Sequence, residues 1–417
     1  MTRLRVFSAF HALLLLAVAL QPGCTHPSSP AASRPTPLLL LVAMDGFRWD
    51  YLDLYADQAP NLRRLRDHGA TSRGLIPVFP SNTFPNHYSV VTGLYPSHHG
   101  IINNRLFDPT LGRFFLAGPG KDVTESIWWG GEPIWVTAEK SGVPAAVGFW
   151  PGSEAKIQGL RPSFWGTFDP RITFDTRFAE FRSWLALPAA ERPRVIAFYF
   201  EEANGYGHRY GPESPELAEA IQLLDTQLAQ LLDAIAAANL EVNLVIVADH
   251  GMTPISRERV IHFDDYIALE DVQIDFDGPV AGLRPLRGSV DQLLAAFASL
   301  PHARAYRIED LPAHLHIDPA NPRNPPVWIL PDEGWEIYSR PRLAAWSGRF
   351  NKGDHGFDPA LRSMHGLFLA HGPSIKTLRE PLDAFENVHV YNLLCALAGL
   401  PPAPNDGDTR LLRLLKD

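Results

Sequence analysis

The sequence predicts an α/β fold in which a mainly parallel central sheet is covered by helices on both faces. Apolar runs of strand length alternate with helical patterns along most of the chain, and the runs are continuous, without a polar residue at every second position. Continuous runs are typical of strands that are buried on both faces of a parallel sheet. The 417 residues are enough for a large core, and a composition of 46% hydrophobic and 20% charged residues excludes a disordered or collagen-like chain.

The expected elements follow one another from residue 38 to the C-terminus. Each strand is a short apolar run, and the helices show apolar residues at helical spacing. The expected strands are 38–44, 143–149, 194–200, 242–248 and 365–370. The expected helices are 61–68, 86–93, 133–141, 215–238 and 387–400. Residues 264–349 are less regular, and we interpret them as an insertion of mixed structure before the last core strand of a domain that spans 38–417.

The first 23 residues resemble an export signal. Arg3 and Arg5 precede an apolar run at 6–20, which is too short for a comfortable membrane span and has the length of a signal-peptide core. The sequence Gln-Pro-Gly-Cys that ends at Cys24 is similar to a bacterial lipoprotein cleavage site, which predicts that Cys24 is lipidated and becomes the first mature residue. An ordinary cleaved signal peptide is the alternative. Residues 24–37, rich in Ser, Pro, Ala and Thr, are expected to be a linker.

The composition limits the partners and the compartment. Lys plus Arg number 37 and Asp plus Glu number 46, which gives a net charge of -9. A protein that binds a nucleic-acid duplex needs a basic surface to displace counterions, so this class is not favoured. Two cysteines exclude a disulfide framework and a Cys-rich zinc site. With the leader, we expect an exported protein in the periplasm or a membrane-anchored lipoprotein, of unknown oligomeric state.

Residues that bind metals stand at the ends of several expected strands. The candidate ligands are Asp45, His208, Asp249, His250 and His365, the last of which opens a strand. Binding sites of open α/β sheets form beyond the carboxyl ends of the strands. A lone Asp at a strand end is usually a turn or helix cap, and a lone His is usually a packed residue. Their recurrence at successive strands favours a site that could hold two metal ions.

Thr83 is the candidate nucleophile. It precedes Pro85 at the expected start of a helix, where proline fits the first turn. The N–H groups and the dipole at a helix start favour an anion. A threonine hydroxyl is a poor nucleophile at neutral pH, and a nearby divalent metal would lower its pKa. The alternative interpretation is that Thr83 only caps the helix.

Taken together, these motifs resemble the nucleotide pyrophosphatase/phosphodiesterase family of the alkaline phosphatase superfamily. The matching segments occur in family order between about 38 and 410, and with the leader they are typical of a bacterial member. They are residues 45–48, 83–88, 91–96, 99–101, 149–154, 207–208, 210–212, 249–252, 332–335, 355–358, 364–365 and 402–405. The resemblance implies an alkaline-phosphatase-like fold and makes 38–417 a phosphodiesterase catalytic domain.

The resemblance also implies roles for single residues in a two-zinc hydrolase. One zinc would be held by Asp45, Thr83, Asp249 and His250. The other would be held at the positions of Asn204, His208 and His365. Thr83 would attack phosphorus to form a covalent intermediate, and Asn104 would donate a hydrogen bond to a phosphoryl oxygen.

Two aromatic residues correspond to the rings that hold a nucleotide base in this family. They are Phe84, directly after the nucleophile, and Phe168, in the segment 164–169. Stacking accepts any base, at roughly 1–3 kcal/mol per base. The substrate implied is a nucleotide or another small phosphodiester. Three alternatives remain open: rings that only pack, a choline-type lysophospholipid substrate recognised through its cation, and a phosphate or sulfate monoester.

Asn204 departs from the family pattern. The family has an aspartate four residues before the histidine of the Gly-His motif, and the segment here contains no insertion or deletion. An amide oxygen is a weaker zinc ligand than a carboxylate and brings no negative charge. We therefore expect a second zinc site that works in altered form, with another metal or with Glu201 or Glu202 recruited. The alternative is a weakly active or non-catalytic zinc-binding homologue.

Overall fold

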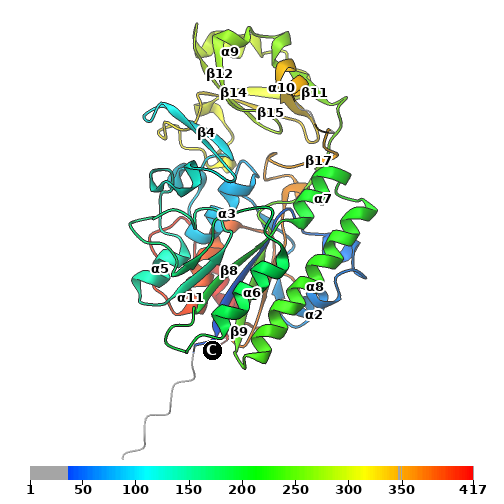
Figure 1. Cartoon of the computed structure of the whole chain (residues 1–417). Coiled ribbons are helices and arrows are strands. Elements are labelled where there is room, and N and C mark those ends of the chain that lie inside the picture. Colours follow the sequence, from blue (N-terminus) through cyan, green and yellow to red (C-terminus); the bar gives the residue numbers. More distant parts are fainter. Residues whose placement is uncertain (1–35, 346–347, 349, 417) are drawn as a thin grey trace, which may run out of the picture. The chain divides into compact units, whose positions relative to one another are not determined.

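The computed structural model describes residues 36–345, 348 and 350–416. The expected signal peptide, Cys24 and most of the linker lie outside the described residues. Within the described part, a central sheet has the strand order β2-β18-β9-β1-β8-β6-β7 (Figure 1). Its strands are β1 (Leu38–Met44), β2 (Ala70–Thr71), β6 (Ala145–Gly148), β7 (Phe164–Trp165), β8 (Val195–Phe200), β9 (Val242–Val247) and β18 (Phe368–His371).

The predicted mainly parallel sheet is confirmed. β1 pairs in parallel with both β8 and β9, and β6 pairs in parallel with β8 and β7. β18 runs antiparallel to its neighbours β9 and β2. Because Phe368 lies opposite Val247, the beginning of β18 meets the same sheet edge as the end of β9.

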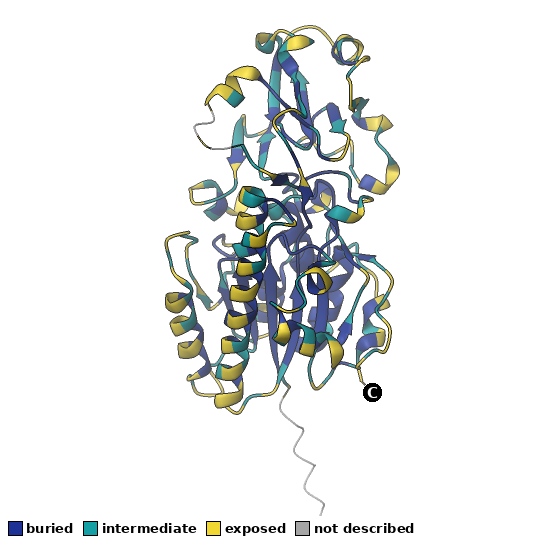
Figure 2. Cartoon of the chain, turned by 90° about the vertical axis from the view of Figure 1, so that its right-hand side faces the viewer, coloured by how far each residue is buried: buried dark blue, intermediate teal, exposed yellow. Residues whose placement is uncertain are grey.

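Helices cover both faces of this sheet, as the sequence predicted. One face carries α2 (Pro60–Asp67), α6 (Phe174–Leu185) and α8 (Pro215–Ala237). The other carries α3 (Thr83–Thr92), α5 (Ile134–Lys140) and α11 (Val390–Ala398). Successive β1 side chains enter opposite cores: Leu40 and Val42 join the first, Leu39 and Leu41 the second. Figure 2 shows the strands buried and the outer faces of the helices exposed.

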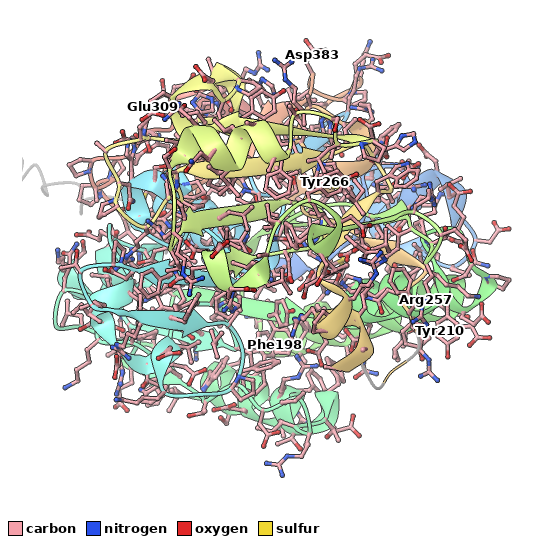
Figure 3. All side chains as sticks on the ribbon, turned by 90° about the horizontal axis from the view of Figure 1, so that it is seen from above. Phe198, Tyr210, Arg257, Tyr266, Glu309 and Asp383 are labelled. Atoms are coloured by element: carbon pink, nitrogen blue, oxygen red, sulfur yellow. The ribbon has the colours of Figure 1, made fainter. Side chains whose placement is uncertain are left out.

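The region expected to be less regular contains a sheet of its own. The antiparallel strands β12 (Val272–Phe276), β13 (Ala281–Pro285), β15 (Val327–Pro331) and β14 (Ala303–Arg307) pair in that order. α9 (Val290–Ala296) packs on them around a separate apolar core. Figure 3 looks down on this lobe, which carries Tyr266 and Glu309. Its strands are five residues each and lack the long apolar runs of the central sheet, so their pattern was weak.

Shorter elements complete the domain and place several site residues. They are α1 (Tyr51–Leu54), β3 (Leu75–Ile76), α4 (Pro96–His99), β4 (Arg105–Asp108), β5 (Arg113–Leu116), α7 (Glu202–Tyr210), β10 (Thr253–Pro254), β11 (Val260–His262), β16 (Glu336–Tyr338), α10 (Arg340–Ala345), β17 (Gly353–Asp354) and β19 (Phe385–Glu386). Among the described residues, no helix combines the length and the apolar character needed to cross a bilayer.

Truncating a buried side chain of β1 tests the role of this strand as the centre of the core. Leu40 is fully buried, so Leu40→Ala should lower the free energy of unfolding by about 2–5 kcal/mol through lost burial and a residual cavity. Leu54→Ala is the matched control because Leu54 is 52% exposed, and it should cost less than about 0.5 kcal/mol. Urea denaturation measures both, and equal costs would contradict the placement of β1.

Candidate metal centre and substrate pocket

The ends of β1, β8 and β9 meet at one sheet edge because the three strands are parallel. The Asp45 N–H donates a hydrogen bond to the carbonyl of Phe200 (2.9 Å), and the Gly46 N–H donates to Asp249 Oδ1 (3.1 Å). Gly46 has φ +67°, and a Cβ there would lie 2.9 Å from Cα of Asn204. Glycine is therefore required for both the turn after β1 and the close approach of α7.

Thr83 is the first residue of α3 and faces this edge. Asn82 before it is extended, so the chain turns sharply into the helix. Thr83 Oγ1 lies 3.4 Å from Nε2 of His250, which follows β9. The Phe84 N–H donates to Asn104 Oδ1 (2.9 Å), which fixes Asn104 beside the helix start. The structure thus brings together the candidate nucleophile and the candidate amide donor that the sequence suggested.

Three buried ligand residues form a first cluster around Thr83. His250 Nε2 lies 3.3 Å from Asp45 Oδ1 and 3.1 Å from Asp249 Oδ2. Asp45, Asp249 and His250 are all almost completely buried. The other Asp45 oxygen, Oδ2, accepts a hydrogen bond of 2.5 Å from the Tyr199 hydroxyl. Together with Thr83, the four residues expected to share one metal converge on one point.

Burial and the close contact of charged groups shift the pKa values of all three residues of the first cluster. Burial and the charge of Asp249 raise the pKa of Asp45 to about 7. Burial alone would also raise the pKa of Asp249, but the charges of His250 and His87 lower it well below its usual value. Burial alone would lower the pKa of His250, and the neighbouring carboxylates instead raise it to about 9. Without a metal, protons on His250 therefore offset the buried negative charge.

A second cluster lies beside the first and comes from α7 and β17. It consists of His208, Asp354 and His355, whose ligand atoms lie within 4.8 Å of one another. The ring of His355 stacks on His250, with centroids 3.4 Å apart, and lies 5.0 Å from the ring of His208. Asn204 lies one helical turn before His208, and its Oδ1 atom is buried and accepts no hydrogen bond in the described structure.

Hydrogen bonds orient the three clustered imidazoles in the same way. Nδ1 of His208, His250 and His355 faces the backbone carbonyls of Gly353 (2.9 Å), Gly251 (2.8 Å) and Ser81 (2.9 Å), respectively. A carbonyl can only accept, so each Nδ1 carries the hydrogen, which leaves Nε2 as the atom that can bind a cation. Burial, then the charge of His250, lowers the pKa of His355 well below its usual value, which keeps this ring neutral.

The structure does not bring His365 into either cluster. Its Nε2 lies 3.1 Å from the Pro359 carbonyl, and its Nδ1 lies 3.2 Å from an Arg362 nitrogen, so both ring nitrogens have partners. It lines a different hollow, with His314 and Glu386. His355 occupies the place that was expected for His365. The signal was available, because His355 opens the matching segment 355–358.

An aromatic pocket lies beside Thr83. Five of the side chains that line it are aromatic, as is common in sites for small ligands. Its lining includes Thr83, Phe84, Phe149, Trp150, Glu154, Phe168 and Tyr199. Both rings expected to hold a base are therefore in one pocket with the candidate nucleophile, Thr83. No Lys or Arg lines it within the described part of the chain.

Glu154 is a pocket residue whose role the sequence did not reveal. Its Oε1 accepts a hydrogen bond from the Phe168 N–H (3.0 Å), and its buried Oε2 has no hydrogen-bond partner among the described residues. Burial raises the pKa of this carboxyl. Because Glu154 sits among aromatic rings, it offers the pocket an acceptor for a hydrogen-bond donor or a cation.

A match to a family model shows which protein family the chain belongs to. The model of the type I phosphodiesterase/nucleotide pyrophosphatase family matches residues 39–358. The chain belongs to this family. It is 39% identical to a venom phosphodiesterase of Macrovipera lebetinus over 93% of this chain and 46% of that protein. It is 38% identical to ectonucleotide pyrophosphatase/phosphodiesterase family member 3 of Bos taurus over 89% of this chain and 43% of that protein. It thus spans about half the length of these relatives.

Solved structures of family members share the fold. Murine ectonucleotide pyrophosphatase/phosphodiesterase 5, in an inactive threonine-to-alanine form in complex with AMP, is 33% identical, with a TM-score of 0.84. The comparison covers 91% of this chain and all of that one. The human counterpart is 32% identical with the same TM-score. These matches confirm the alkaline-phosphatase-like fold, whereas the relatives named here are from snakes and mammals, so a bacterial origin stays a prediction.

The family is metal-dependent, and the residues of both clusters fit divalent cations. Oδ1 of Asp45 and of Asn204 are buried without a hydrogen bond in the described structure, and three Nε2 atoms are free of backbone partners. A buried polar atom without a partner is costly unless something binds it. Carboxylate oxygen and imidazole nitrogen are donors that zinc accepts.

Replacing two histidines from the same segment distinguishes the expected from the observed ligand. His355→Ala should reduce the metal bound after reconstitution by about one ion per chain, because it removes one of the oriented Nε2 donors. His365→Ala is the matched control and should bind as much metal as the unmodified protein does. Elemental analysis of dialysed protein measures both. The opposite pattern would restore His365 as the ligand.

Proposed function

We propose that the chain is an exported phosphodiesterase and nucleotide pyrophosphatase that hydrolyses phosphodiester or phosphoanhydride bonds of nucleotides, with two zinc ions and a covalent intermediate on Thr83. One observation carries the proposal: Thr83 Oγ1 stands between a cluster of metal-binding groups and an aromatic pocket. Export is supported by the leader-like sequence at 1–23 and by the site's resemblance to the family's ectoenzymes.

Asp45, Asp249 and His250 would hold one dication with Thr83, and Asn204, His208 and His355 would hold the other. When bound, such ions supply Lewis-acid polarisation and lower the pKa of a hydroxyl near them. Thr83 Oγ1 then forms a bond to phosphorus while the bond from phosphorus to the leaving oxygen breaks. Water later breaks the Thr83–phosphorus bond and restores the hydroxyl.

Asn104 is positioned to stabilise the phosphoryl group. Its Oδ1 accepts from the Phe84 N–H, which leaves the two Nδ2 hydrogens to donate. A neutral donor can stabilise charge that develops on one phosphoryl oxygen. Because no Lys or Arg lines the pocket among the described residues, the site favours a singly charged diester over a doubly charged monoester.

The pocket favours a nucleotide as the group that the diester carries. Phe84 and Phe168 both line it, and stacking on two rings suits a base. The murine relative in complex with AMP supports this choice. Glu154 supports a second candidate, a choline-type lysophospholipid, because a carboxylate among aromatic rings also suits a quaternary ammonium group.

Thr83→Ala should lower kcat/KM for bis-nitrophenyl phosphate at least about a thousandfold, since the attacking oxygen is removed. Thr83→Ser keeps a hydroxyl and should retain part of the activity. Acid quenching during turnover, followed by peptide mass spectrometry, should find the phosphoryl adduct on Thr83. Near-normal turnover by Thr83→Ala, with no adduct in the unmodified protein, would rule out the covalent route.

Phe84→Ala and Phe168→Ala should each raise KM for a nitrophenyl nucleotide ester roughly 5- to 150-fold, the equivalent of about 1–3 kcal/mol of stacking. Methyl nitrophenyl phosphate, which has no base, should be hydrolysed nearly as well as before. Phe114→Ala is the control variant because Phe114 packs on Phe107 outside the pocket. Hydrolysis of glycerophosphocholine lipids without hydrolysis of nucleotides would favour the second candidate, a choline-type lysophospholipid substrate.

A further inference from the structure

The residues proposed to hold the second ion bring no negative charge to it. His208 and His355 would bind a cation as neutral imidazoles, through the Nε2 atoms that their backbone hydrogen bonds leave free. The side chain of Asn204 is a neutral amide, and its buried Oδ1 accepts no hydrogen bond in the described structure. A partly buried cation without a counter-charge is costly. As the sequence encodes it, the second site is therefore weak.

The carboxylates near this site do not supply the missing charge. Asp354 approaches His208 at Nδ1 (3.7 Å), whereas Nε2 is the atom left to bind an ion. Glu201 and Glu202, the residues expected to compensate, belong to neither ligand cluster among the described residues. A negative charge at the ion would therefore have to arise at position 204 itself.

Asn204 stands directly before Gly205, and the pair Asn-Gly occurs once in the 417 residues. Asparagine is a thermolabile residue, because the backbone nitrogen of the next residue can attack its side-chain carbon, Cγ. A bond from the Gly205 nitrogen to Cγ forms, the bond from Cγ to Nδ2 breaks, and Nδ2 leaves as ammonia with the proton of the attacking N–H. Water then opens the cyclic imide to aspartate or to isoaspartate. The net reaction converts an amide and water to a carboxylate and ammonium.

Packing does not explain the glycine at position 205. Apart from the adjoining residues and the helix backbone, no atom of the described structure lies within 4 Å of a Cβ built there, and φ is not positive. A Cβ at Gly207, in the same helix, would lie 3.0 Å from Cε of Met252, so packing requires that glycine. A glycine inside a helix weakens it relative to alanine. Gly205 thus has a cost without a packing reason, and its lack of a Cβ obstructs attack on Asn204 least.

The start of α7 makes the Gly205 nitrogen available. Its N–H donates to the Glu201 carbonyl (3.1 Å) in the first turn of the helix, and Glu201 makes no side-chain cap hydrogen bond. Helix ends fray, so a local opening of this turn frees the nitrogen. Gly205 is exposed and Asn204 partly exposed, which lets water reach the imide and ammonia leave.

We propose that Asn204 is a deamidation site, and that its conversion to aspartate gives the second metal site a carboxylate ligand. The proposal rests on the proposed function for the presence of a second ion. Asn204 Oδ1 lies 3.2 Å from where a Cβ of Gly46 would be, next to Asp45 of the first cluster. The new carboxylate takes the place of the amide there. The conversion needs no other enzyme, so the aspartate content increases with the age of the protein.

Peptide mass spectrometry of the protein, fresh and after incubation at mildly alkaline pH, measures the conversion. Aspartate at position 204 should increase with time, and ammonia should be released in equal amount. Gly205→Ala should lose most of this conversion because its methyl group obstructs the attack, and the open space at that position lets the variant fold. Tyr206→Ala is the matched control. It changes the next, exposed residue of α7, leaves the Asn-Gly pair intact and should convert like the unmodified protein.

Zinc affinity, measured by chelator competition, tests what the new carboxylate does. Asn204→Asp should bind the second zinc at least about tenfold more tightly than freshly made protein, because the ion gains a negatively charged ligand. Incubated protein should approach this affinity in proportion to its aspartate content. Gly205→Ala should keep the low affinity after incubation. Gly205→Ala combined with Asn204→Asp should bind as tightly as Asn204→Asp alone, which separates the conversion from any effect of the alanine on the site.

Three results would overturn the proposal. An intact amide at position 204 after prolonged incubation shows that the site does not convert. Isoaspartate as the sole product, or aspartate without a gain in zinc affinity, shows that the conversion does not serve metal binding. Diester hydrolysis is measured separately: its absence in Asn204→Asp with both zinc ions bound refutes the proposed function, whereas the mass spectrum still decides whether Asn204 converts.

Discussion

The site depends on two carboxylates, Asp45 and Asp249, that are buried side by side at the end of neighbouring strands. Two such charges repel each other and lose hydration, so they persist only where other groups compensate. His250 and His87 approach Asp249, and the Tyr199 hydroxyl binds Asp45. These partners come from β8, from the loop after β9 and from α3, so the carboxylates tie the sheet edge to the helix that carries Thr83. A dication between them would replace repulsion with coordination, whereas protons on His250 do so only in part.

The central sheet could be predicted from the sequence because its strands are continuous apolar runs with sharp ends. β1 has the expected bounds, since the run from Leu38 to Met44 is followed by Asp45 and Gly46. The helix α7 was not expected, because its glycines and polar residues give no helical apolar pattern. The antiparallel direction of β18 could not be predicted either, because the apolar pattern of a strand does not indicate whether it pairs in parallel or antiparallel. Long-range packing decides such features.

The first cluster followed from the rule that strand ends meet, but the second did not follow in full. His355 precedes β18 by 13 residues and His365 by 3, and both stand in segments that match the family, so position along the chain does not decide between them. What separates them is the set of hydrogen bonds on each ring. His355 keeps Nε2 free and stacks on His250, while His365 has partners on both nitrogens. Such tautomer information arises only when loop carbonyls have been placed by the fold.

The two clusters differ in charge, and this difference bears on how the centre would assemble. The first offers two carboxylates to an ion, whereas the residues proposed to hold the second ion are two imidazoles and the neutral amide of Asn204. Attraction between a dication and its ligands grows with the number of negative charges, above all where water is excluded. The first site should therefore fill before the second. The second site also repels an anionic phosphodiester less than it would if a carboxylate stood at position 204. Asn204 would thus lower metal affinity and anion repulsion together, which is compatible with the hydrolase proposed above.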